Sequence, residues 1–149
     1  MSSGLVHQRY HALGWVVVLP TSLISCVYSP PVGTGILVGY ALGRWVDPDL
    51  DQVGVSSAEG RIINDFKILG YVIVGYTTIY GAVFRRYHRS FITHFPGVST
   101  AIRLVYLFWW LYFTINILYD YQIMVGIGVW VGLTLSDLVH FIVDNILKD

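Results

Sequence analysis

The sequence predicts an all-α fold: an integral membrane bundle of about four to five apolar helices, forming a single domain over residues 1–149. Three observations support this prediction. Apolar residues make up 55% of the chain, charged residues make up only 12%, and several apolar segments are long enough for membrane helices. A soluble domain of this size could not bury so much apolar surface.

Five apolar segments carry the prediction, and in chain order they span residues 12–28, 32–46, 68–84, 102–119 and 122–143. A helix that crosses a bilayer needs about 17–25 residues, so the fourth and fifth segments are long enough and the third is borderline. The first two are short, and the second is rich in glycine. They are compatible with a helical hairpin, two tilted spans or a partly re-entrant pair.

Charge and cysteine content exclude several classes of protein. The formal net charge is zero, whereas nucleic-acid-binding proteins carry a basic excess, so we expect no nucleic acid partner. The single cysteine, Cys26, excludes an intrachain disulfide and a cysteine-rich zinc site. Pro20 interrupts the first apolar segment and no clear cleavage site follows, so we expect no cleavable signal peptide.

The longest polar connection spans residues 47–67, and we expect a loop there with a short helix. It begins with Asp47–Asp51, in which three carboxylates alternate with other residues. One interpretation is a helix start, with the first aspartate as the cap and Pro48 as the first helical residue. The other is a carboxylate cluster that bridges metal ions. A calcium loop is excluded, because Gln52 and Ala58 stand where an EF-hand needs glycine and glutamate.

The last apolar segment carries Asp137, His140 and Asp144 at positions i, i+3 and i+7, which lie on one helical face. An aspartate deep in a membrane helix costs up to about 2.5–3.5 kcal/mol on insertion scales, so it normally faces a partner inside the bundle. Two interpretations follow. Asp137 pairs with an arginine or histidine of another helix for structural reasons, or this face ligates a metal.

The other histidines form two pairs. His7 and His11 are four residues apart, which suits either two ligands on one helix or two solvated side chains at a membrane surface. His88 and His94 are six residues apart and cannot share a helical face. Pro96 biases its preceding residue away from helix. We therefore expect His88 to end the third apolar helix and His94 to lie on the loop that follows.

Four short blocks, spread over nearly the whole chain, resemble a known family. They are Ser3-Gly4 with His7, Pro48-Asp49-Leu50-Asp51, His88-Arg89-Ser90 with His94 and the following Arg103–Tyr106, and Leu135-Ser136 with His140 and Asp144. The pattern resembles a bacterial metal-binding membrane protein family of unknown function. It is similar to LexA-regulated inner-membrane metal-dependent hydrolases and, more distantly, to zinc-dependent phospholipase C and P1 nuclease. The resemblance implies an all-helical protein in a bacterial inner (cytoplasmic) or internal membrane.

The resemblance also implies a set of metal ligands, namely His7, Asp49, Asp51, His88, His94, His140 and Asp144. We expect one or two divalent transition metal ions. Imidazole and carboxylate ligands favour zinc, with manganese or iron as alternatives, over copper(I) or calcium.

The leading hypothesis is a membrane-embedded metal-binding protein that hydrolyses a phosphoester, such as a phospholipid. A bound metal lowers the pKa of its water to about 7. Arg89 or Arg85 would hold the phosphate, unless these arginines form a cluster that binds lipid headgroups. Asp137 or Asp47 would act as the base.

Two alternatives remain beside the hydrolase. One is a non-catalytic small membrane subunit, whose polar cluster joins helices or docks a larger membrane complex or homo-oligomer. The other is a small channel or transporter lined by Asp137 and His140.

A single metal site conflicts with a topology in which every apolar segment crosses the membrane. His7 and the acidic run would then lie on one side, and His88, His94 and Asp144 on the other. A single site requires that the third segment does not cross fully, or that the ligands converge inside the bundle from both ends.

Overall fold

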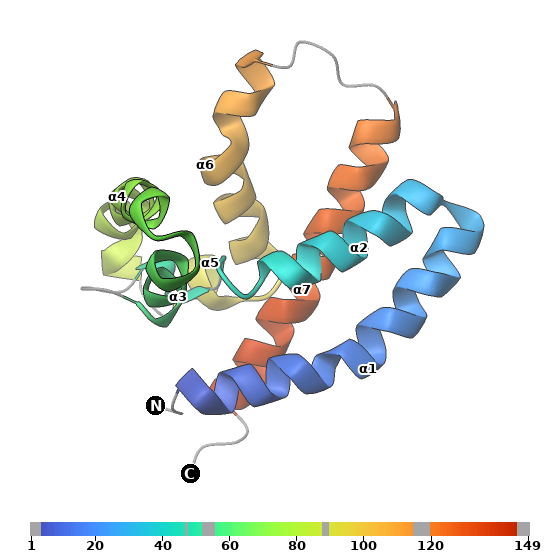
Figure 1. Cartoon of the computed structure of the whole chain (residues 1–149), viewed down its shortest axis with the longest axis horizontal. Helices are drawn as coiled ribbons and strands as arrows, with labels where there is room; N and C mark the ends of the chain where they lie inside the picture. Colours follow the sequence, from blue (N-terminus) through green and yellow to red (C-terminus); the bar gives the residue numbers. More distant parts are fainter. Residues whose placement is uncertain (1–3, 47, 52–55, 88–89, 115–119, 146–149) are drawn as a thin grey trace.

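The computed structural model describes residues 4–46, 48–51, 56–87, 90–114 and 120–145 (Figure 1). Every regular element in these ranges is helical, which confirms the predicted all-α class. In chain order the elements are α1 (Gly4–Tyr28), α2 (Pro30–Leu42), η1 (Pro48–Asp51), α3 (Ser57–Phe66), α4 (Ile68–Phe84), η2 (Arg85–Tyr87), α5 (Phe91–His94), α6 (Val98–Thr114) and α7 (Asp120–Asn145), where η marks a short 3-10 helix.

Three of the five predicted apolar segments lie wholly in helices. The segment 32–46 continues past the end of α2 at Leu42, and the end of the segment 102–119 falls outside the described residues. Three helical stretches are long and apolar enough to cross a membrane: Gln8–Tyr28, Ile68–Tyr87 and Asp120–Asn145. Large apolar side chains on them are exposed, with Val27 at 80% and Ile68 at 84%. Exposed apolar surface on this scale marks a face that another apolar phase covers. These features indicate a membrane protein.

Helices α2 and α7 pack backbone to backbone through glycine. A Cβ atom added at Gly39 would lie 2.2 Å from the Val129 carbonyl oxygen, and one added at Gly132 would lie 2.2 Å from the Ile36 carbonyl oxygen. Only a hydrogen atom fits at such positions, which is how small residues spaced four apart bring membrane helices together. This close approach fixes the position of α7, on which His140 lies.

Helices α1 and α2, joined at Ser29, form one helical hairpin, and helices α3 and α4 form a second. Ser56 and Glu59 make a capping box at the start of α3, and the Thr77 hydroxyl of α4 donates to Glu59 Oε1 at 3.0 Å. Between the two helices Lys67 adopts a φ of 53°, a backbone conformation that favours glycine. The short helix predicted within residues 47–67 is thus α3.

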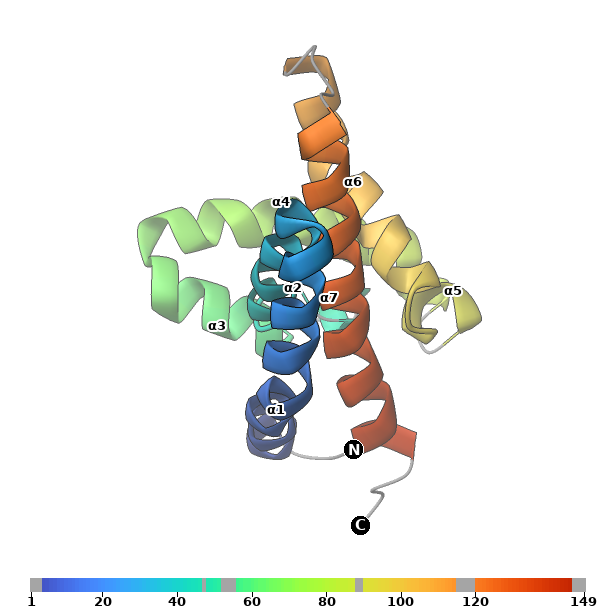
Figure 2. The same cartoon turned by 90° about the vertical axis from the view of Figure 1, so that its right-hand side faces the viewer.

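The two hairpins run in different directions. Figure 2 shows α1, α2 and α7 following one direction, whereas α3 and α4 project sideways from them. Helix α4 does not run parallel to α1 and α7, although it is long enough to span a membrane. This arrangement removes the topological conflict, because residues before and after α4 meet beside the same part of α7.

Candidate metal centre

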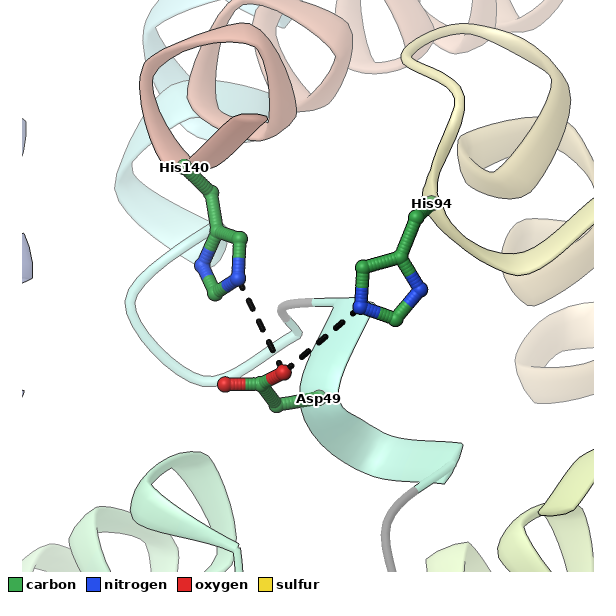
Figure 3. Close-up of side chains that lie close together, drawn as sticks. All are labelled: Asp49, His94 and His140. Atoms are coloured by element: carbon green, nitrogen blue, oxygen red, sulfur yellow. Dashed lines mark ion pairs between the residues drawn. The ribbon is translucent and has the colours of Figure 1, made fainter. Parts of the chain in front are cut away.

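Three side chains from three separate elements converge beside α7 (Figure 3). Asp49 belongs to η1, His94 ends α5, and His140 lies on α7. One potential ligand atom from each lies within 4.8 Å of the others. The two histidine Nε2 atoms face the same carboxylate oxygen: Asp49 Oδ1 lies 3.8 Å from that of His94 and 3.7 Å from that of His140. The structure thus brings together three of the seven predicted ligands.

The turn η1 holds Asp49 by burying its two neighbours. Pro48 and Leu50 are at most 2% exposed, and Leu50 packs against Ala58 of α3 and Tyr80 of α4. The Asp49 side chain is 18% exposed and contacts both histidines. Burial of the flanking apolar residues therefore positions a carboxylate that the local sequence alone would leave in a loop.

His94 is positioned by the short helix α5. The prediction that His94 lies on a loop is therefore wrong, because residues 91–94 form one helical turn. This turn ends before Phe95 and Pro96, as the restriction on residues that precede proline predicts. The buried Thr93 hydroxyl donates to the Tyr87 carbonyl oxygen at 2.6 Å, and Thr93 Oγ1 lies 3.2 Å from His94 Nδ1. Because the hydroxyl hydrogen is already used, Oγ1 can accept a hydrogen bond from Nδ1. That tautomer leaves the lone pair on His94 Nε2, the atom that faces Asp49.

His140 has a second carboxylate next to its Nε2 atom. Asp144, one turn later on α7, places Oδ2 at 3.1 Å from it. The His140 side chain is only 9% exposed, while that of Asp144 is 26% exposed. Without a metal, Asp144 can accept a hydrogen bond from this nitrogen. With a metal bound at Nε2, which then has no hydrogen, Asp144 is placed beside the metal as an additional ligand or a proton acceptor.

The spacing of the three groups suits a small metal ion. Tetrahedral zinc with bonds of about 2.0–2.1 Å separates neighbouring ligand atoms by about 3.3–3.4 Å. The observed separations of 3.7 and 3.8 Å from Asp49 Oδ1 are only slightly longer. Small side-chain rotations would close the difference, and the chemistry of the donor set fits a borderline metal such as zinc.

Asp137 lies on the same helix but in a different environment. It is 1% exposed and forms an ion pair with Arg103 of α6, which is equally buried, and it accepts a hydrogen bond from the Thr100 hydroxyl. Arg103 also donates to the backbone carbonyl of Val46 at 3.1 Å. This is the structural Asp–Arg pair that the sequence left open as one of two interpretations. The proposed catalytic role of Asp137 stays a prediction.

The other predicted site residues either fall outside the described residues or do not belong to the group of three ligands. Asp47, His88 and Arg89 lie outside the described residues, as do the side chains of His7 in α1 and Asp51 in η1. Arg85 lies exposed in η2. His11 lies in α1, where its ring stacks on Tyr40 with centroids 4.4 Å apart and its Nε2 lies 3.1 Å from the Tyr40 carbonyl oxygen.

A cavity that the sequence did not predict reaches His140 from another side. Its volume is about 390 Å³, and its wall includes His11, Trp15, Arg44, Trp45, Arg61 and His140. The arginines and tryptophans come from α1, α3 and the segment after α2. Their convergence depends on how these helices pack, so no local pattern would have revealed it.

Comparison with known proteins adds no further assignment: no protein-family model, no curated protein and no solved structure matches the chain. The geometry of the described residues is therefore the basis for function.

Proposed function

We propose that the protein is an integral membrane helical bundle in which Asp49, His94 and His140 bind one divalent transition metal ion that serves phosphoester hydrolysis. One observation carries the proposal. Two imidazole nitrogens from elements far apart in sequence face one carboxylate oxygen, at 3.8 and 3.7 Å, in a largely buried location. In a chain with so few charged residues, an arrangement of this kind is best explained by a shared ligand.

The donor set favours zinc, with manganese or iron as alternatives. Structural zinc sites use four protein ligands, whereas catalytic sites use three and keep a position open for water or substrate. Three residues meet here, and Asp144 contacts the group through His140. The site therefore resembles a catalytic centre more than a closed structural one.

A divalent metal in such a site polarises a phosphoester oxygen and activates water. The residues of this chain would supply the rest. Thr93 holds the tautomer of His94, and Asp144 Oδ2, next to His140 Nε2, is placed to accept a proton. The assignments of Asp137 as base and Arg89 as phosphate ligand belong to the same proposal, although Asp137 contacts Arg103.

Elemental analysis of the purified protein tests the metal site. We expect about one zinc, manganese or iron ion per chain in the wild type. His94→Ala and His140→Ala should each lose most of it, because removing one of three ligands leaves too few. His11→Ala is the matched control: its ring belongs to the neighbouring Tyr40 contact and not to the group of three. Wild-type protein without metal, or full metal content in both ligand variants, would contradict the proposal.

Turnover distinguishes the hydrolase from a non-catalytic subunit. The second function is favoured by one observation: the three ligands join η1, α5 and α7, so a metal there would cross-link distant parts of the chain. With bis(p-nitrophenyl) phosphate as substrate, the hydrolase predicts metal-dependent release of nitrophenol that His94→Ala abolishes. A metal that raises the melting temperature without any turnover would instead favour the structural role, with docking to a larger complex or a second copy.

The proposal includes a bacterial inner-membrane location and a relationship to the LexA-regulated metal-dependent hydrolases. Its support is the set of sequence blocks described above. Asp49, His94 and His140, the residues that converge, are three of the ligand positions that this resemblance implies.

A further inference from the structure

The cavity beside His140 has the composition of a phosphate-binding site. Its wall contains Arg44 and Arg61, and no acidic residue is among the described residues that line it. Arginine carries a permanent charge and a planar set of donors that match phosphate oxygens. A volume of about 390 Å³ suits a small ligand.

The two arginines are held in place by local contacts. Arg61 Nε donates to the backbone carbonyl of Arg44 at 2.6 Å, which ties the Arg61 side chain to the backbone of Arg44. Asp65, which is outside the lining, lies 3.5 Å from Arg44 and accepts a hydrogen bond from Trp45 Nε1 at 2.8 Å. Arg44, whose side chain is 54% exposed, thus shares its charge with Asp65, and both arginines bring a permanent positive charge to the wall of the cavity.

The rest of the wall combines apolar residues with the polar Gln8, His11, Ser136 and His140. Trp15 and Ala12 of α1 and Val139 of α7 contribute to it, and His140 provides the connection to the metal centre. A ligand that fills the cavity would thus place a charged group at the arginines, an apolar part against α1 and α7, and part of itself beside His140. That combination describes an amphiphile with an anionic head.

From this geometry we infer that the cavity binds a phosphate ester. Arg44 and Arg61 hold the phosphate group, and the bound ester extends to His140. Two sources share this chemistry, a phospholipid and a water-soluble phosphate ester, and the test separates them. Binding itself does not need the metal; only the step in which the bound ester reacts rests on the proposed function.

Isothermal titration calorimetry measures the affinity of the full chain for the probes and tests the inference. The protein is kept in maltoside detergent, which contains no phosphate. The probes are dihexanoyl phosphatidate, glycerol phosphate and dihexanoylglycerol. We expect the first to bind, and the double variant Arg44→Ala/Arg61→Ala to weaken its binding by at least about tenfold, because each lost charged hydrogen bond costs that order of affinity. Tighter binding of phosphatidate than of glycerol phosphate supports the phospholipid source, and equal binding supports the soluble one.

Matched variants keep the result interpretable. Arg44→Lys/Arg61→Lys retains both charges and should preserve most of the binding, which guards against a variant that fails to fold. Arg86→Ala removes an exposed arginine outside the cavity and should leave phosphatidate binding unchanged. Val139→Trp should block the cavity without changing its charge.

The outcomes separate this inference from the metal site. Unchanged phosphatidate affinity in the double alanine variant, or equal binding of dihexanoylglycerol, which has no phosphate, would overturn the inference. Metal content is measured on the same samples. Protein that binds phosphatidate through the arginines but holds no metal would overturn the proposed function alone.

Discussion

Replacing Asp137 by asparagine should destabilise the protein strongly, because it removes the carboxylate that pairs with the buried charge of Arg103. Both side chains are 1% exposed, and Arg103 also donates to the backbone carbonyls of Val46 and Ser99, which carry no full charge. Breaking a buried ion pair in this way costs about 3–5 kcal/mol. At about 2–4 °C per kcal/mol for a chain of this size, the melting temperature should fall by about 6–20 °C.

A double variant distinguishes the effect of removing one charge of the Arg103–Asp137 pair from the effect of removing both. Arg103→Met with Asp137→Leu replaces both charges by apolar side chains of similar volume, which is often neutral or stabilising in a buried site. We therefore expect it to recover most of the melting temperature. Asp65→Asn is the matched control, because it breaks an Asp–Arg pair whose side chains are 33% and 54% exposed. That change should cost no more than about 1 kcal/mol.

The assay is thermal unfolding in detergent, followed by circular dichroism, together with turnover of the phosphodiester substrate. If Asp137 has a structural role alone, stability and turnover fall together and the double variant restores both. If Asp137 is also the catalytic base, the double variant would recover the melting temperature without recovering turnover. A melting temperature for Asp137→Asn equal to that of Asp65→Asn would refute the structural reasoning.

Three more predictions follow from the backbone. Gly132→Leu should separate α2 from α7 and lower the metal content, whereas Gly126→Leu on the same helix, with nothing within 4 Å of the added Cβ, should do neither in elemental analysis. Lys67→Gly should raise the melting temperature by a few degrees, since relief of the φ of 53° is worth about 1 kcal/mol; a fall would contradict the strained turn. Single cysteines at Asn64 and Tyr87, placed in a variant without the native cysteine, should react with a membrane-impermeant thiol reagent from the same side of the membrane. The reason is that α4 projects sideways from the direction of α7. Labelling from opposite sides would mean that α4 spans the membrane.

Much of the fold is predictable because its signals are local. The length of each apolar segment and the proline at the start of α2 act on neighbouring residues, so the long helices appear where they are expected. The short helix α5 lies where a loop was expected. The proposed ligands are also local in character. Histidine and aspartate are rare in this chain, and a charged residue in an apolar segment requires a partner.

The partners of those residues depend on contacts between distant segments. Asp137 alone is compatible with a metal ligand, a base or an ion pair, and only the packing of α6 against α7 places Arg103 beside it. Likewise, the sequence predicted Asp49, His94 and His140 as ligands together with four other residues. The three meet because η1, α5 and α7 converge, which depends on the direction of α4.

The sequence by itself therefore determined the helical class, the apolar character of the helices and the residue types available for a metal, since composition and spacing act within one segment. Tertiary structure decided which of those residues meet. The close approach of Gly39 and Gly132, the pairing of Arg103 and the cavity of Arg44 and Arg61 each need two or more helices. Such contacts follow from how helical surfaces fit together, and no single segment of this chain contains that information.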